Sequence, residues 1–73
     1  MNKCYVVLDM YERLKSGEMI FLNKSCTEYG ISEPTFRRYL SNLRNFFCEK
    51  QAMEIVYVPK FKGYELRKLD KNE

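Results

Sequence analysis

The amino-acid sequence predicts an α+β fold, mainly α-helical, in which three helices are followed by a small β-hairpin. Apolar residues repeat at helical spacing in two long segments, and a tight-turn signal at Gly30-Ile31-Ser32 precedes the second of them. Beyond residue 53 the composition changes to that of β-strands. The 73 residues have room for one small domain, which we expect to span residues 1–73.

The first helix is predicted at about residues 4–16. Its apolar residues recur at helical spacing, and they are Val6, Val7, Leu8, Met10, Tyr11 and Leu14. Charged residues occupy the remaining positions, so this helix is expected to bury one side and expose the other. Gly17 stands where a residue in the left-handed conformation commonly ends a helix.

Residues 18–22 are short and mainly apolar, which indicates a brief extended segment. A short second helix is then predicted at about residues 24–29. Asn23 is suited to cap it by accepting a hydrogen bond from the backbone. Gly30 is suited to end it.

The third helix is predicted at about residues 33–49. Ser32 is a favourable N-cap, and Pro34 is tolerated in the first turn because the N–H that it lacks would have no partner there. The apolar stripe of this helix is regular and consists of Phe36, Leu40, Leu43 and Phe47. These four side chains are expected to lie in the core.

The wing, a β-hairpin, is predicted at about residues 54–69. Residues 55–58 are β-branched and aromatic, and residues 64–69 alternate in part between polar and apolar. The segment between them, Pro59–Gly63, has the composition of a turn and ends in glycine.

Composition excludes several classes of function. The chain has no histidine, which removes the commonest general base and the commonest metal ligand. The three cysteines, Cys4, Cys26 and Cys48, form no C-x-x-C pair and cannot supply a zinc site by themselves. We therefore expect buried or half-buried thiols in a reducing compartment, no metal, no cofactor and no enzyme activity.

The sequence also carries no signal for a membrane protein. No apolar run approaches the ~20 residues of a membrane-spanning helix. The first apolar run resembles the start of a signal peptide, but Asp9 and Glu12 interrupt it too early. The expected location is the cytoplasm.

Positive charge is concentrated in the second half of the chain. The net charge is +3 overall, while residues 1–34 sum to −1 and residues 35–68 sum to +5. An excess of this size over the third helix and the hairpin is a weak electrostatic signal for a polyanionic partner. The alternative is a solvated basic face without a ligand.

The order of helix, short extended segment, short helix, tight turn, long helix and hairpin is that of a winged helix-turn-helix. In this arrangement the third helix can enter the major groove of DNA. The hairpin can carry basic residues to flanking phosphates or to the minor groove.

Residues 22–47 also resemble the helix-turn-helix of the DeoR-type bacterial transcription regulators, a domain also found at the N-terminus of WYL-domain regulators. The resemblance rests on the turn Gly30-Ile31-Ser32, on Thr35 and Phe36, on the pair Arg37-Arg38, and on Leu40 and Leu43. Lys62-Gly63-Tyr64-Glu65-Leu66 is similar to the end of the family's wing. The resemblance implies double-stranded DNA as the partner and a homodimer that reads two half-sites. The family carries its effector domain after the wing, so this chain is expected to be either a small stand-alone regulator or part of a longer protein.

The candidate DNA-binding residues of the third helix lie opposite its apolar stripe. Arg38 is the first candidate for a base contact, because its guanidinium matches the O6 and N7 acceptors of guanine. Thr35 is placed for a base, a thymine methyl group or a phosphate, and Arg37 on the flank for a phosphate. Ser32 is mainly a cap that also suits a phosphate. The further candidates on this face are Pro34, Ser41 and Asn42.

On the hairpin, Lys60 and Lys62 flank Phe61 at the tip. They are expected to bind phosphates while Phe61 packs on sugar or a groove wall; the alternative is a solvated turn whose lysines protect a sheet edge. A second class of function also stays open. A winged helix can be a protein-interaction module, such as an adaptor or antirepressor, and the candidates for an exposed aromatic patch are Tyr5, Tyr39, Phe46, Tyr57 and Phe61.

Overall fold

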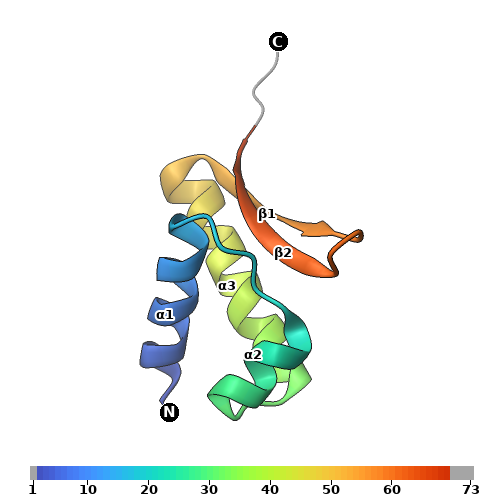
Figure 1. Ribbon diagram of the computed structural model, residues 1–73. Helices are drawn as coiled ribbons and strands as arrows, with labels where there is room; N and C mark the ends of the chain where they lie inside the picture. Colours follow the sequence, from blue (N-terminus) through green and yellow to red (C-terminus); the bar gives the residue numbers. More distant parts are fainter. Residues whose placement is uncertain (1, 70–73) are drawn as a thin grey trace.

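The computed structural model describes residues 2–69 and confirms the predicted fold class (Figure 1). In the described residues three helices, α1 (Lys3–Lys15), α2 (Leu22–Tyr29) and α3 (Glu33–Gln51), precede the strands β1 (Met53–Val58) and β2 (Gly63–Lys68). The two strands pair antiparallel, from Met53 opposite Lys68 to Val58 opposite Gly63. Helix α1 lies beside α3, while α2 and the hairpin lie at other sides of α3 (Figure 1). This arrangement fits a winged helix-like fold.

Helix α1 begins one residue before the predicted start, because the Asn2 side chain accepts a hydrogen bond from the Tyr5 N–H at 2.9 Å. Gly17 has the expected positive φ, at 94°. The prediction that Leu8 belongs to the buried stripe is wrong, since its side chain is 64% exposed. The buried residues are Val6, Met10 and Leu14. At about 100° per residue Leu8 falls nearly opposite the centre of that stripe.

Helix α2 begins at Leu22, two residues before the predicted start. The prediction that Asn23 caps it is wrong: the N-cap is Phe21, whose backbone is extended, and no side chain caps the first turn. The cause lies in the preceding residue. The Ile20 N–H donates to the Tyr64 carbonyl at 2.9 Å and the Tyr64 N–H donates to the Ile20 carbonyl at 2.8 Å. This bridge fixes Ile20 as extended chain, and the helix starts directly after Phe21.

Helix α3 follows α2 through the predicted three-residue turn, in which Gly30 has a left-handed φ of 68°. Ser32 caps α3 as predicted, accepting a hydrogen bond from the Thr35 N–H. The helix runs two residues beyond the predicted end. Its last residue, Gln51, accepts a hydrogen bond from Lys15 at 3.0 Å and donates one to the Tyr11 hydroxyl at 3.0 Å, which ties the end of α3 to α1.

The wing occupies residues 53–68, one residue earlier at each end than predicted. Its tip is a tight turn in which the Phe61 and Lys62 N–H groups donate to the Val58 carbonyl. The left-handed residue of this turn is Lys62, with φ 57°, and not the glycine that follows it. Gly63 has a different role: a Cβ there would lie 2.6 Å from Cε1 of Phe21. The absence of a side chain at Gly63 therefore lets Phe21 pack against the wing.

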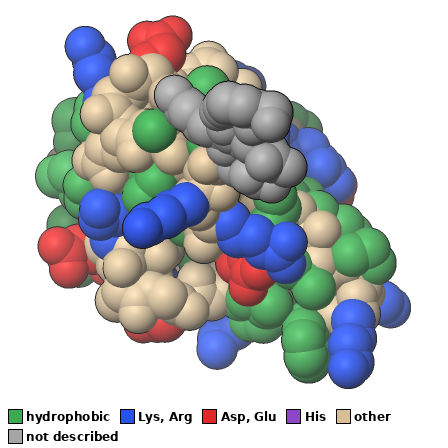
Figure 2. Space-filling view, turned by 90° about the horizontal axis from the view of Figure 1, so that it is seen from above, with side chains coloured by type: hydrophobic (Ala, Val, Ile, Leu, Met, Phe, Trp, Pro, Cys, Tyr) green, Lys and Arg blue, Asp and Glu red, His purple; other side chains and the backbone are tan. Residues whose placement is uncertain are grey.

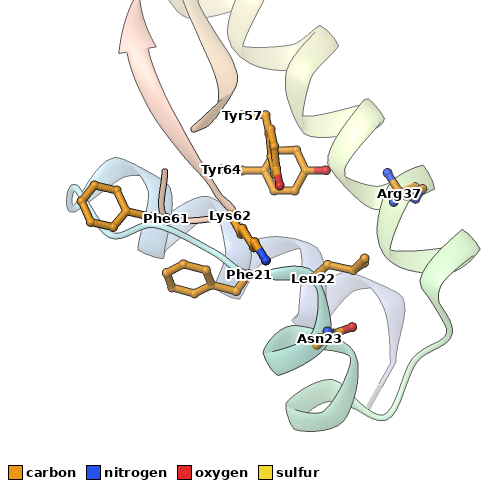
Figure 3. A pocket seen from close by; sticks show the side chains of 8 residues that line it. All are labelled: Phe21, Leu22, Asn23, Arg37, Tyr57, Phe61, Lys62 and Tyr64. Atoms are coloured by element: carbon orange, nitrogen blue, oxygen red, sulfur yellow. The ribbon is translucent and has the colours of Figure 1, made fainter. Parts of the chain in front are cut away.

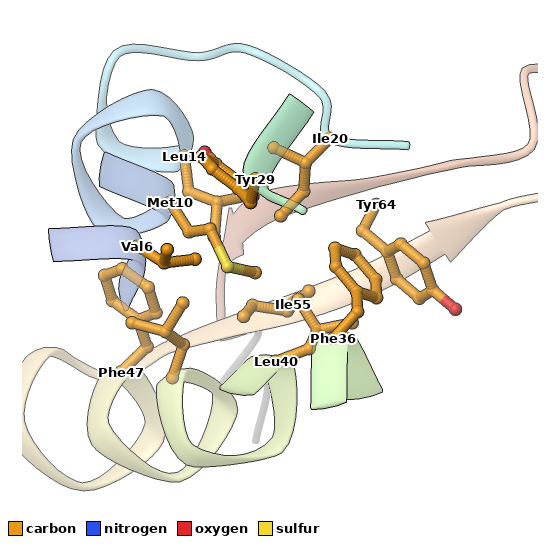
Figure 4. Close-up of a cluster of buried hydrophobic side chains, with 11 residues drawn as sticks. Val6, Met10, Leu14, Ile20, Tyr29, Phe36, Leu40, Phe47, Ile55 and Tyr64 are labelled. Atoms are coloured by element: carbon orange, nitrogen blue, oxygen red, sulfur yellow. The ribbon is translucent and has the colours of Figure 1, made fainter. Parts of the chain in front are cut away.

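The core lies between α1, α3 and the inner side of the hairpin (Figure 4). The predicted stripe of α3 is fully confirmed, because Phe36, Leu40, Leu43 and Phe47 are all buried. The other buried hydrophobic residues of the core are Val6, Met10, Leu14, Ile20, Tyr29, Ile55 and Tyr64. Within residues 2–69 no helix combines the length and the apolar composition that crossing a membrane requires.

The residue after α3 offers a test of the fold. Ala52 ends the helix with φ 52°, a conformation that L side chains rarely adopt. Ala52→Gly is expected to raise the free energy of unfolding by roughly 1 kcal/mol, because glycine accepts this conformation without the steric cost. Urea denaturation followed by circular dichroism measures the change.

The matched control is the reverse substitution at the end of α2. Gly30→Ala places a Cβ in open space at φ 68°, so it tests the backbone conformation alone. It is expected to lower the free energy of unfolding by a similar amount. A loss of stability in Ala52→Gly would contradict the left-handed helix end.

Candidate nucleic-acid interface

The exposed face of α3 carries three of the predicted site residues, Pro34, Arg38 and Ser41. Pro34, Arg38, Ser41 and Asn45 are all exposed on the side opposite the buried stripe. None of them is a large apolar residue, and the one apolar residue among them is the proline in the first turn. This part of the helix presents short polar groups and one arginine, a composition that suits hydrogen bonding to base edges in a groove.

Arg38 lies near the centre of this face, about 200° around the helix from Phe36. Within the described part of the chain its guanidinium forms no ion pair, although both Arg13 and Arg37 do. A free, exposed guanidinium has both edges of its fork available for two parallel hydrogen bonds. Of the predicted site residues it is the one that fits a guanine contact best.

The N-terminal residues of α3 are engaged with one another. The Ser32 hydroxyl forms a hydrogen bond of 3.0 Å with the Thr35 hydroxyl and also caps the helix. Thr35 is half-buried. Its hydroxyl is therefore partly committed to the cap.

Asn42 lies to one side of the exposed face. It lines an apolar groove of about 310 Å³ between α1 and α3, together with Val7, Leu8, Tyr11, Leu43 and Phe46. This groove is separate from the polar part of α3 that holds Arg38. Of the predicted exposed aromatic residues, Phe46 thus lines the groove, and Tyr5 is exposed on α1.

Arg37 lies on the opposite side of α3 from Asn42, toward the wing. Its guanidinium forms an ion pair of 2.9 Å with Glu33, one turn earlier. The hydrogen bond to Glu33, followed by the electrostatic effect of Tyr64, raises the pKa of Arg37. The side chain remains 55% exposed, so it can also reach an anion beside the helix.

The wing carries the other predicted site residues at its tip. Lys60, Phe61 and Lys62 are all exposed, and neither lysine forms an ion pair within residues 2–69. The Lys60 ammonium lies 5.6 Å from the centroid of the Phe61 ring. Phe61 is 57% exposed. The tip therefore presents two cations and an exposed aromatic ring.

A pocket of about 430 Å³, here called the wing pocket, lies between the wing and the starts of α2 and α3. Four aromatic side chains, two cations and the first turn of α2 surround it; they are Phe21, Tyr57, Phe61 and Tyr64, Arg37 and Lys62, and Leu22 and Asn23 (Figure 3). The pocket thus contains three of the predicted site residues, Arg37, Phe61 and Lys62. Its other lining residues were not predicted as site residues; they are Phe21, Leu22, Asn23, Tyr57 and Tyr64.

One signal in the sequence pointed to part of this pocket. A four-residue turn between Val58 and Gly63 places Tyr57 directly opposite Tyr64 in the hairpin, and the register confirms this pair. Their ring centroids are 5.1 Å apart. Phe21 carried no such signal, because its position depends on the approach of α2 to the wing.

Three charged residues in the first half of the molecule form ion pairs with one another. Arg13 forms ion pairs with Glu28 at 2.6 Å and with Asp9 at 3.2 Å, and the Tyr29 hydroxyl donates to Asp9 at 2.7 Å. The hydrogen bond from Arg13 lowers the pKa of Glu28, while burial and the bond to Asp9 raise the pKa of Tyr29. These contacts join α1 to α2.

The cations in the second half are in large part free. Within the described residues, those on α3 and the hairpin that form no ion pair are Arg38, Arg44, Lys50, Lys60, Lys62 and Lys68. Arg44, which is not among the predicted site residues, lies on the same side of α3 as Arg37. Seen from above, Lys and Arg side chains project at several points of this face, with acidic side chains beside some of them (Figure 2).

The cysteines differ in part from their expected burial. Cys26 is half-buried, but Cys4 and Cys48 are exposed, which contradicts the prediction for these two. Both are on the outer sides of their helices, which the apolar stripes of α1 and α3 do not include. Among residues 2–69, no three His, Cys, Asp or Glu side chains lie close enough to hold a metal ion.

The order and packing of the elements define a winged helix-like fold with a polar α3 face beside a basic wing. Comparisons of the chain with protein-family models, with curated proteins and with solved structures gave no match.

Proposed function

We propose that this chain binds double-stranded DNA in a sequence-specific manner, as a bacterial or phage-type transcription regulator or as the DNA-binding domain of one. In this proposal α3 enters the major groove, where Arg38 contacts a base edge and Ser41 lies deeper along the same face. The wing lies on the flanking backbone, where Lys60 and Lys62 neutralise phosphates. The resemblance to DeoR-type regulators gives the same roles to these elements.

The observation that carries the proposal is the unpaired guanidinium of Arg38 at the centre of an exposed polar face. A free guanidinium fork matches the O6 and N7 acceptors of guanine with two parallel hydrogen bonds. Selection of binding sites from random duplex DNA at two salt concentrations tests the proposal. Enrichment of a common sequence supports it, and an absence of salt-dependent binding at any sequence refutes it.

The wing lysines give a second, quantitative test. Lys62→Ala is expected to weaken binding to all duplex sequences alike and to reduce the slope of log K against log salt by about 0.9, the value for one phosphate contact. The fold is expected to stay intact, because alanine keeps the Cβ at a residue whose backbone is already left-handed. Fluorescence anisotropy with labelled duplexes at several salt concentrations measures both effects.

Lys68→Ala is the matched control for this test. Lys68 is an exposed lysine at the end of the hairpin far from the tip, opposite Met53. Its removal lowers the net charge by the same amount and should leave the salt slope nearly unchanged. Equal slopes in the two variants would show that the wing tip does not contact the phosphate backbone.

A second candidate function is supported by the apolar groove between α1 and α3. Leu8, at 64% exposure, and Phe46, at 44%, leave apolar surface on the outside of a small protein. Such a surface suits a protein partner, including a second copy of the chain in a homodimer. Because the groove is separate from the Arg38 face, DNA binding and a protein contact are compatible. Failure of all duplex binding would leave the protein-interaction module as the better account.

A further inference from the structure

The wing pocket is larger and more aromatic than a contact with a DNA phosphate requires. Its volume of about 430 Å³ lies within the range of pockets for small organic ligands, ~300–1,000 Å³. Four of its eight lining residues are aromatic. A phosphate group needs donors and positive charge, but it makes no use of aromatic walls. The composition therefore points to a ligand with a planar ring.

The aromatic residues of the wing pocket differ in exposure: one is buried as an inner wall, and two are half-exposed at the opening. Tyr64 is only 9% exposed and forms the inner wall, packed against Phe36 on its core side. Tyr57 is 50% exposed and Phe61 57%. The two outer rings thus keep apolar surface in contact with solvent, which a stacked ring would cover.

Positive charge borders the pocket at two positions, Lys62 and Arg37. The rings of Phe21 and Phe61 are on one side, Arg37 is on the opposite side, and Lys62 projects between them (Figure 3). The first turn of α2 also borders the pocket, and no side chain caps its N–H groups. An anionic group on the ligand would meet these donors while its ring lies against the aromatic side.

Contacts within the fold hold the walls of the pocket in place. The Ile20–Tyr64 bridge holds the start of α2 beside β2, and Phe21 packs directly on Gly63. The Lys62 backbone is held in the left-handed conformation by the hydrogen bond from its N–H to the Val58 carbonyl, at 2.8 Å. A non-glycine residue in this conformation is uncommon and is found more often at functional sites.

From these observations we infer that the wing pocket binds a nucleotide, with the base stacked on Tyr57 and Phe61 and the phosphate beside Lys62, Arg37 and the start of α2. The same chemistry is offered by a free mononucleotide and by one nucleotide of a single strand. This inference goes beyond duplex recognition by α3 and does not require it.

Titration of the ¹⁵N-labelled full chain, followed by ¹H–¹⁵N correlation spectra, tests the inference. The probes are AMP, adenosine, inorganic phosphate and an oligothymidylate of eight nucleotides. We expect shifts to concentrate at Phe21, Tyr57 and Lys62, with AMP binding at least tenfold more tightly than adenosine or phosphate. Binding of AMP identifies a free nucleotide as the ligand, and binding of the oligonucleotide without AMP identifies a strand. Absence of both, or equal affinity for phosphate and AMP, overturns the inference.

Two matched variants locate the site. Tyr57→Ala removes a half-exposed stacking surface and should weaken nucleotide binding roughly 5- to 150-fold, the range for loss of one stacked base. Tyr5→Ala removes a tyrosine of similar exposure on α1, far from the pocket, and should leave the affinity unchanged. Equal effects of the two would overturn the inference. Duplex binding without nucleotide binding refutes only this inference, whereas nucleotide binding without duplex binding refutes only the proposed function.

Discussion

Replacement of Arg38 by alanine is expected to relax specificity at a single base pair of the selected DNA site. The guanidinium lies at the centre of the exposed α3 face and forms no ion pair within residues 2–69. Loss of a bidentate arginine–guanine contact costs about 1–3 kcal/mol of discrimination, or roughly 5- to 150-fold. Competition binding with a set of duplexes, each changed at one base pair, measures the loss.

Two further variants separate the contribution of the planar guanidinium of Arg38 from that of its positive charge. Arg38→Lys keeps the positive charge but loses the planar fork, so it should lose discrimination while the salt dependence stays unchanged. Arg44→Ala removes an exposed, unpaired arginine two turns further along α3 and should weaken all duplexes to a similar degree. If Arg38→Ala also weakens all duplexes equally, Arg38 contacts a phosphate and the base contact is disproved.

The largest effect on stability is expected for Phe36→Ala. The ring is fully buried and packs against Tyr64 with 6.1 Å between ring centroids, so it joins α3 to the wing. Truncation of a buried phenylalanine costs about 3–5 kcal/mol. A domain of 73 residues has a total stability of roughly 4–11 kcal/mol, so much of it would be lost.

Urea denaturation monitored by circular dichroism measures this loss. Phe46→Ala is the control, because Phe46 is on the same helix but its side chain is 44% exposed. It should cost well under half as much, since less apolar surface leaves the solvent on folding. Equal costs for the two variants would contradict the assignment of the buried stripe of α3.

Most of α3 could be predicted from the sequence because its signals are local and agree with one another. The cap at Ser32, the proline after it and the regular apolar stripe all specify the same helix in the same orientation. In α1 the apolar residues occupy more than one side, so the pattern alone does not decide which side is buried. Contact with α3 decides it, and Leu8 remains outside.

The wing pocket could not be predicted because its walls come from three separate segments. Phe21, Arg37 and Tyr57 are brought together only by the packing of α2, α3 and the hairpin. The roles of Lys62 and Gly63 were also beyond the local pattern. Glycine at the end of a turn normally indicates a left-handed backbone, but here the contact with Phe21 requires the absence of a Cβ.

The bridge between Ile20 and Tyr64 sets the distance between the start of α2 and the wing, which it joins. Because this spacing depends on backbone hydrogen bonds, it does not depend on which side chains occupy the wing tip or the outer face of α3. Residues at positions such as Arg38 and Lys60 can therefore change without altering the position of the wing relative to α2. The fold thus allows new binding preferences to arise through single substitutions on an unchanged frame.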